Sequence, residues 1–191
     1  RSYKVCSMGP PSSGGIAVIQ ILGQLQRFDL AALGADNPVA WHLLAESERL
    51  AFADRAAFVG DPDFVQVPTA GLIDAGYIRA RGELISASST MAKVSAGRPR
   101  GAPPRKAGTS NEVPSTSHFS AVDARGNVAA LTSTVEGSFG SGLISGGFVL
   151  NNELTDFSLA PTDAQGQPIA NRLQPGKRPR SSMAPTLVFD Q

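Results

Sequence analysis

Apolar residues in the first part of the chain follow the spacing of a strand and then that of a helix. Residues 1–8 alternate loosely between polar and apolar side chains, which predicts a strand. From Ile16 to Leu22 the apolar residues recur about every third position. This spacing predicts a helix with one buried face over residues 14–27.

Two further helices are expected before residue 92. Pro38 suits the first turn of a helix, because its ring fixes φ and it has no N–H group to leave unpaired. The apolar side that follows predicts that this helix runs to Val59. A weaker helical pattern covers residues 69–85. Residues 1–91 are therefore expected to form a helical region with an edge strand.

The composition changes over residues 92–107. This stretch has five positive charges, three prolines and no acidic residue. It holds too little apolar surface to offset the entropy lost on ordering, so we expect a mobile, solvated connector. A basic run can also bind phosphates, but no aromatic residue is interleaved for base stacking, which favours the connector.

The pattern beyond Pro114 is typical of β-structure, and a hairpin is its clearest feature. Two alternating segments flank a turn in which Gly126 suits the left-handed position of a three-residue loop. A loop at 124–126 pairs the residues on either side of it, and counting back along both strands then places Thr116 opposite Thr134. Their Cβ atoms would be roughly 4.5–5.5 Å apart. A bulge would shift this register by one residue. Taken alone, the pair is also compatible with an ordinary cross-strand threonine pair.

The remaining sequence predicts bends and short strands. The glycine-rich segment 140–147 is expected to turn sharply, and strands are predicted at 148–150 and 186–189. Residues 159–179 form a polar, proline-containing loop in this prediction.

The composition excludes several kinds of protein. The 191 residues carry a net charge of +1, which gives no overall field toward nucleic acid or a membrane surface. Cys6 is the single cysteine, so neither an internal disulfide nor a cysteine-based metal site can form. No apolar run approaches the roughly 18 residues of a membrane span. The chain begins at Arg1 without an initiator Met, which suggests a segment of a longer protein.

Six motifs follow one another along the chain. They are PPSSGG at 10–15, AESERLAFADR at 45–55, GDPDFV at 60–65, TSHFS at 116–120, NNELTDF at 151–157 and KRPRSSMAPT at 177–186. In sequence and order they resemble motifs of the gamma-glutamyltranspeptidase family of N-terminal-nucleophile hydrolases. The first three are similar to the last third of that family's large subunit, and the last three to the start of its small subunit. The resemblance implies an α+β fold, the four-layer αββα sandwich, of which this chain would supply a part.

The resemblance also implies a precursor that cuts itself between Ser115 and Thr116. This divides the chain into the end of a large subunit at 1–91, a connector at 92–115 that ends at the cleavage site, and the start of a small subunit at 116–191. The freed Thr116 would use its hydroxyl as nucleophile and its own α-amine as base. An α-amine titrates near about 8, so much of it is neutral near physiological pH. An uncut amide nitrogen cannot serve as a base, so cleavage would activate the zymogen.

The other site roles implied by the resemblance concern a γ-glutamyl substrate. Thr134 would hydrogen-bond the nucleophile. Glu136, Glu153 and Asp156 would hold the substrate α-amino group, although the first two positions are amides in some family members. Ser181 and Ser182 would hydrogen-bond its α-carboxylate. The family's clamping Arg is expected upstream of Arg1 and its oxyanion Gly-Gly pair beyond Gln191, and the loop 159–179 has no Tyr for a lid.

The function implied is that of a gamma-glutamyltransferase or glutathione hydrolase, with water or an amino acid as acceptor and with no cofactor, metal or nucleic acid. The family resemblance implies a periplasmic or secreted location. The alternatives are a cephalosporin-type (glutaryl) acylase of the same fold, or an unprocessed, non-catalytic homologue. A triad of Ser120, His118 and Asp123 is disfavoured, because Asp123 would face the opposite side of the strand.

Overall fold

The computed structural model describes residues 3–110 and 116–190, which form one helical layer and three antiparallel two-stranded sheets. The elements in chain order are β1 (Tyr3–Ser7), α1 (Gly14–Leu25), α2 (Leu30–Leu33), α3 (Pro38–Phe58), α4 (Thr69–Leu72), α5 (Ala75–Gly82), β2 (Thr116–Val122), β3 (Val128–Thr134), β4 (Ile144–Ser145), β5 (Phe148–Val149), the 3₁₀ turn η1 (Glu153–Asp156) and β6 (Thr186–Asp190). Helices in the first part and antiparallel strands in the second confirm the α+β class.

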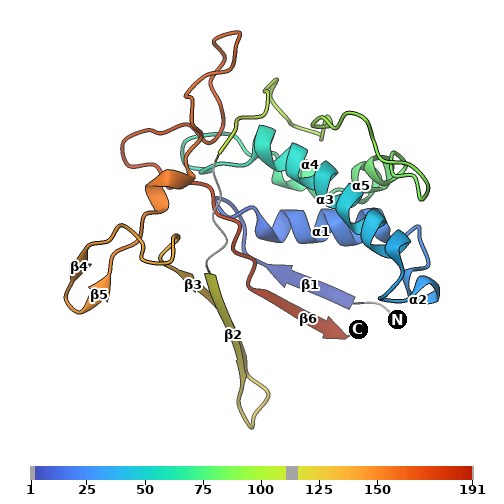
Figure 1. Ribbon diagram of the computed structural model, residues 1–191, viewed down its shortest axis with the longest axis horizontal. Helices are drawn as coiled ribbons and strands as arrows, with labels where there is room; N and C mark the ends of the chain where they lie inside the picture. The colour runs from blue at the N-terminus through green and yellow to red at the C-terminus, as the bar shows by residue number, and fades with distance from the viewer. Residues whose placement is uncertain (1–2, 111–115, 191) are drawn as a thin grey trace.

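The first and last strands pair with each other beneath the helices (Figure 1). Tyr3 is opposite Asp190 and Ser7 is opposite Thr186 in this antiparallel pair. Helices α1, α3, α4 and α5 lie on one side of the β1–β6 sheet, whereas the β2–β3 and β4–β5 hairpins project away from it (Figure 1). The chain therefore returns to its starting strand only after it has formed both hairpins.

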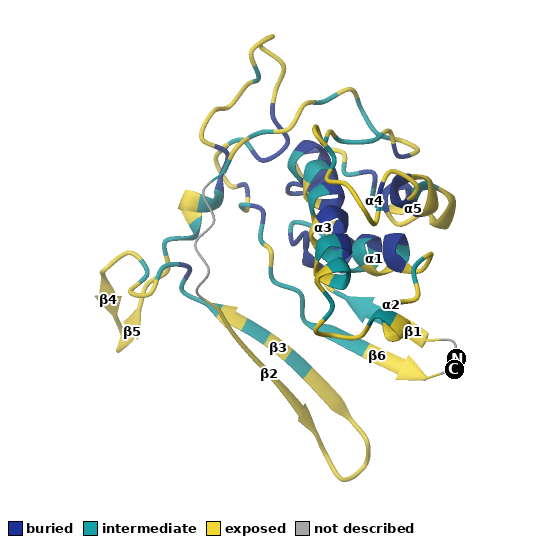
Figure 2. Ribbon diagram, turned by 45° about the vertical axis from the view of Figure 1, so that its right-hand side comes forward, coloured by how far each residue is buried: buried dark blue, intermediate teal, exposed yellow. Residues whose placement is uncertain are grey.

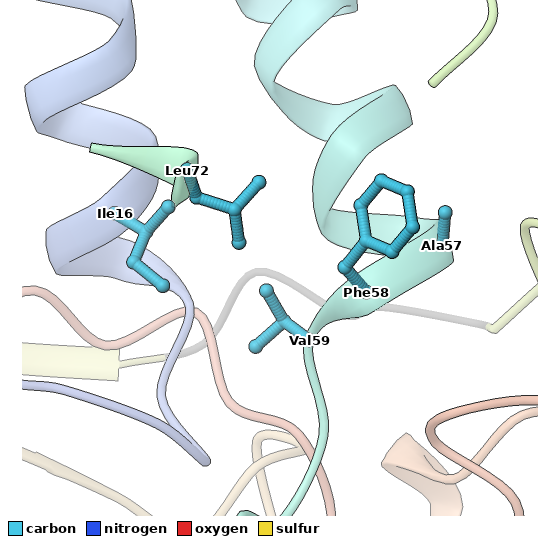
Figure 3. Packing of buried hydrophobic residues seen from close by; sticks show 5 residues of the cluster. All are labelled: Ile16, Ala57, Phe58, Val59 and Leu72. Atoms are coloured by element: carbon cyan, nitrogen blue, oxygen red, sulfur yellow. The ribbon is translucent and has the colours of Figure 1, made fainter. Parts of the chain in front are cut away.

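Two apolar clusters hold the helical layer together. Figure 3 shows the first, in which Ile16 of α1 and Leu72 of α4 pack with the end of α3 at Ala57, Phe58 and Val59. The second cluster joins the far end of α1 to the middle of α3 and comprises Leu25, Leu43, Leu50 and Ile85. Each apolar side chain fully buried in such a cluster contributes about 1.5–3 kcal/mol.

The predicted helices at 14–27 and 38–59 are confirmed as α1 and α3, but the prediction of one continuous helix over residues 69–85 is wrong. Residues 69–85 form two short helices, α4 and α5, in place of one. Asp74 separates them, because its side chain accepts a hydrogen bond from the Tyr77 N–H and starts α5 as its N-cap. The four-residue helix α2 was not expected from the apolar spacing.

The prediction of a solvated connector over residues 92–107 is wrong for part of that segment. It has no helix or strand, but the Gly97 N–H donates to Asp54 Oδ1 at 2.7 Å. Arg81 donates to the Ser95 carbonyl at 2.9 Å, and Ala96 packs against the first cluster. The segment is held by its main-chain groups, which an argument from apolar side-chain content does not count.

The predicted hairpin is confirmed in register as well as position. Thr116 is opposite Thr134, and the pairing continues to Val122 opposite Val128. Gly126 has φ +81°, the left-handed conformation that the three-residue loop requires.

The strand at Phe148 is also confirmed, but its partner β4 was not expected. These two strands are joined by Gly146 and Gly147, both with positive φ, which suits a two-residue hairpin loop. No helix among the described residues is long and apolar enough to cross a membrane.

Candidate active site

A cavity of about 500 Å³ lies where the start of the β2–β3 hairpin meets η1, the segment 181–184 and helix α3. Every predicted site residue within the described part of the chain lines it, whereas Ser115 lies outside the described residues. The lining consists of Phe52, Thr116, His118, Thr132, Thr134, Glu136, Glu153, Asp156, Ser181, Ser182, Met183 and Ala184. Residues more than 130 positions apart in the sequence thus share one cavity.

Two threonines face each other across the hairpin at one end of this cavity. Thr116 is the first residue of β2 and is exposed, and Thr134, the last residue of β3, is paired with it. The Thr134 hydroxyl oxygen accepts a hydrogen bond from the Glu136 N–H at 2.9 Å. Thr134 is therefore fixed by the turn that follows its own strand.

Glu136 sits in that turn with a backbone conformation that is rare for glutamate. Its φ is +73°, and it is the single non-glycine residue with positive φ in the described chain. Its side chain is 6% exposed although it lines the cavity. The neighbouring Gly137 N–H donates to Asn152 Oδ1 at 2.8 Å, which ties the turn to the segment before η1.

The 3₁₀ turn η1 brings two more carboxylates to the same cavity. Glu153 and Asp156 stand at its two ends, and the main-chain carbonyl of Asp156 accepts from Asn171 Nδ2 at 2.7 Å. Burial raises the pKa of Glu153, and the nearby charge of Glu136 raises it further. Carboxylates gathered in this way suit a cationic ligand such as an ammonium group.

The serine pair lies on the other side of the cavity and is held by the start of α1. The Ser13 N–H and hydroxyl both donate to the Ser181 carbonyl, at 2.8 and 2.7 Å. A Cβ on Gly14 would lie 2.6 Å from the Ser182 carbonyl oxygen, so glycine is required where this segment crosses α1. The motif at residues 10–15 thus serves to seat the motif at 177–186.

Arg55 also contacts the serine pair, and the sequence interpretation did not single it out. Its Nε donates to Ser13 Oγ at 2.6 Å and its Nη2 to Ser182 Oγ at 2.7 Å. A signal existed in the sequence, because Arg55 has the helical spacing of the buried residues Ala51 and Phe58. A charged residue on a buried helix face needs polar partners.

The catalytic triad that could be drawn from the sequence does not form. His118 contacts Thr132 Oγ1 at 2.8 Å and Ser120 Oγ at 3.3 Å. Asp123 instead accepts from the Asn127 N–H and side chain in the hairpin loop, at the opposite end of the strand from Thr116.

The three carboxylates do not make a metal site, since no group of three His, Cys, Asp or Glu residues in the described chain is placed to hold a metal ion.

Comparison with known proteins identifies relatives along the whole chain. The sequence profile of the gamma-glutamyltranspeptidase family matches residues 1–191. A glutathione hydrolase proenzyme of Bacillus subtilis is 40% identical over 201 residues, covering 99% of this chain and 33% of that protein. One from Escherichia coli is 41% identical over 194 residues, covering 98% and 32%.

Acylases are similar as well. The acylase ACY 1 proenzyme of a Pseudomonas species is 38% identical over 196 residues, covering 100% of this chain and 32% of that protein. The crystal structure of a cephalosporin acylase from Bacillus halodurans superimposes with a TM-score of 0.75 at 23% identity, covering 98% of this chain and 30% of the other. The last match shows a shared fold. The chain spans about a third of the length of the relatives that it matches.

Proposed function

The chain belongs to the gamma-glutamyltranspeptidase family, and we propose that it supplies the reacting threonine and the substrate contacts of a longer glutathione hydrolase or gamma-glutamyltransferase. The observation that supports this best is the shared cavity of Thr116, three carboxylates and the serine pair. Because the chain covers a third of its relatives, the complete site would require further residues of the precursor.

The proposed reaction begins with self-cleavage before Thr116, which converts its amide nitrogen to a free amine. The amine accepts the proton of the Thr116 hydroxyl, and the hydroxyl oxygen attacks the γ-carbonyl carbon of the substrate. The carbon–nitrogen bond breaks, the leaving amine takes the proton, and a γ-glutamyl ester of Thr116 remains. Water or the amine of an amino acid then attacks this ester and restores the free hydroxyl. Thr134, opposite Thr116 on β3, would hydrogen-bond the nucleophile.

The substrate would be held by its two charged α-groups. In this proposal Glu136, Glu153 and Asp156 bind the α-ammonium, and the hydroxyls of Ser181 and Ser182 bind the α-carboxylate. The two sets line the same cavity as Thr116, so one bound glutamyl group could contact both sets and the nucleophile.

A glutaryl acylase is the second candidate, since acylases are among the relatives. A glutaryl group lacks the ammonium, so it would leave three carboxylates facing a neutral methylene. Ionised carboxylates are costly to bury without a charged or hydrogen-bonding partner. The carboxylate cluster therefore favours γ-glutamyl over glutaryl substrates. An unprocessed homologue is the third candidate, and it would lack the free amine of Thr116.

The proposed division into a large-subunit part at 1–91, a connector at 92–115 and a small-subunit part at 116–191 follows from cleavage between Ser115 and Thr116. Contacts across this division support a complex that persists after cleavage. Arg178 pairs with Asp61 at 2.6 Å, and Ser13 binds Ser181. The periplasmic or secreted location implied by the family stays a prediction.

The test uses the full-length precursor and its Thr116→Ala variant. Denaturing electrophoresis should show two fragments for the wild type and one band for the variant, because the variant lacks the attacking hydroxyl. The processed wild type should hydrolyse a γ-glutamyl anilide at least about tenfold faster than a glutaryl anilide, the effect of one lost charged contact.

Three results would contradict the proposal. Cleavage of the Thr116→Ala variant at the same place would rule out Thr116 as nucleophile. Preference for the glutaryl anilide would assign the site to the acylase alternative. A single uncut band from the wild type would indicate the non-catalytic homologue.

A further inference from the structure

Arg55 is a buried cation that contacts the serine pair from behind. It lies on the core-facing side of α3 and is 5% exposed, yet it does not line the cavity. The ring of Phe52, one turn earlier on α3, lies 5.2 Å from the Arg55 guanidinium carbon and does line the cavity. Arg55 therefore stands next to the cavity wall, one side chain removed from anything bound in it.

The guanidinium group contacts Ser182 directly and is linked to Ser181 through Ser13. Nη2 donates directly to Ser182 Oγ at 2.7 Å. Nε donates to Ser13 Oγ at 2.6 Å, and the Ser13 hydroxyl in turn donates a hydrogen bond to the Ser181 carbonyl at 2.7 Å. One planar group thus sets the position of Ser182 by its side chain and of Ser181 by its main chain.

The direction of these hydrogen bonds matters for what the serines can bind. A guanidinium group can only donate, so Ser182 Oγ is the acceptor in this contact. The hydrogen of the Ser182 hydroxyl is then directed away from Arg55. A carboxylate is a strong hydrogen-bond acceptor, and the adjacent positive charge makes the hydroxyl a better donor to an anion.

We propose that Arg55 is a positioning residue that orients the Ser181–Ser182 pair for the α-carboxylate of the substrate, and so selects substrates that carry this group. The inference rests on the proposed function, because it takes the serine pair as the carboxylate contact. Lysine cannot replace arginine here, since a single ammonium lacks the planar fork that spans Ser13 and Ser182.

The experiment compares two inhibitors of γ-glutamyl anilide hydrolysis by the full-length processed protein. L-Glutamate carries the α-carboxylate, whereas 4-aminobutyrate has the same chain and ammonium without it. For Arg55→Lys we expect the inhibition constant of L-glutamate to rise about tenfold, the size of one lost hydrogen bond to a charged group. The constant for 4-aminobutyrate should change less than about twofold, and kcat should stay nearly constant, as expected for lost ground-state binding.

Three further variants separate positioning from folding. Ser13→Ala removes the hydroxyl that links Arg55 to the Ser181 carbonyl. It should also raise the inhibition constant of L-glutamate relative to that of 4-aminobutyrate. Combining Arg55→Lys with Ser182→Ala should raise the inhibition constant of L-glutamate by less than the product of the two single effects, since both substitutions act in part through the Ser182 hydroxyl. Arg81→Lys is the matched control. Arg81 is also buried in the helical layer, and its polar partners are Asp54 and the carbonyls of Leu50 and Ser95 in place of Ser13 and Ser182.

The outcomes distinguish failure of the proposed role of Arg55 from failure of the proposed γ-glutamyl function. A wild type without γ-glutamyl hydrolysis overturns both. A wild type that is active, with Arg55→Lys weakening the two inhibitors equally or no more than Arg81→Lys does, overturns the role of Arg55 alone. If Arg55→Lys is not processed, Ser13→Ala tests the role of Arg55 in its place. An unchanged ratio of the inhibition constants of L-glutamate and 4-aminobutyrate in Ser13→Ala would then overturn that role.

Discussion

At the scale of single residues, Glu136 adopts a conformation that its residue type disfavours. A positive φ costs a non-glycine residue about 1–3 kcal/mol, and such strain often accompanies a functional position. Here the strain is held by the bond from the Glu136 N–H to Thr134 and by the bond from the Gly137 N–H to Asn152. The turn directs the Glu136 side chain toward the cavity shared with Glu153.

Glu136→Gly is therefore expected to keep or raise the thermal stability of the full-length protein and to weaken its binding of the substrate. Glycine adopts φ near +73° without strain, but it removes one carboxylate from the ammonium contact. We expect KM for a γ-glutamyl anilide to rise about tenfold. Glu136→Gln, which keeps the strain and loses the charge, should raise KM similarly without a gain in melting temperature. A large loss of stability in the glycine variant would show that the side chain is structural.

At the scale of elements, the loop after α3 is joined to the segment that leads into the serine pair. Arg178 donates to Asp61 through its main-chain N–H, its Nε at 3.0 Å and its Nη2 at 2.6 Å. Asp61 is buried, and Arg178 also reaches Asp63. The hydrogen bonds from Arg178 lower the pKa of Asp61 to about 2 despite its burial. This pairing aligns the segment that seats Ser181.

The Asp61–Arg178 pair predicts a stability contribution that is lost in acid. A carboxylate whose folded pKa is depressed stabilises the fold fully above its unfolded value of about 3.8, and this stabilisation disappears as pH falls toward 2. Urea unfolding midpoints of wild type and Asp61→Asn should differ most near pH 5 to 6 and converge between about pH 4 and 2. A constant difference across this range would contradict the proposed ionisation. Asp74→Asn, which alters an exposed helix cap away from Arg178, is the control for the effect of the Asp-to-Asn substitution itself.

At the scale of the whole molecule, the helical layer has its own core but the hairpins do not. Figure 2 shows β2–β3 and β4–β5 coloured mainly as exposed. Their exposed side chains include the large apolar residues Phe119, Ile144 and Phe148, and Phe139 is exposed in the segment between the two hairpins. Two-stranded sheets have little independent stability, and their open edges can pair with other chains. The chain also spans about a third of its relatives.

The isolated 191-residue chain is therefore expected to show little or no turnover of a γ-glutamyl anilide compared with the full-length protein at equal molar concentration. Loss of one oxyanion donor alone lowers kcat by about 10²–10³. Size-exclusion chromatography should show association through the exposed strands. Activity within tenfold of the full-length protein, from a monomer, would mean that this segment carries a complete site.

The local pattern of the chain was sufficient for much of the fold. The two longer helices and the β2–β3 register follow from apolar spacing and turn chemistry, which act between neighbours in sequence. The α+β class was implied by the family resemblance. The order of motifs also identified the family. The candidate site residues came from that resemblance, because isolated serines, threonines and acids are common in ordinary loops and strands.

Contacts between distant segments decided the rest. The pairing of β1 with β6, the passage of residues 181–184 over Gly14 and the position of Arg55 behind Ser182 join residues more than 120 positions apart. Periodicity and turn residues carry no signal for such contacts, because side chains meet there only after the helices and strands have packed. For the same reason the segment 92–107 was predicted to be solvated. In the folded chain its Gly97 N–H donates to Asp54, a contact that the sequence pattern does not indicate.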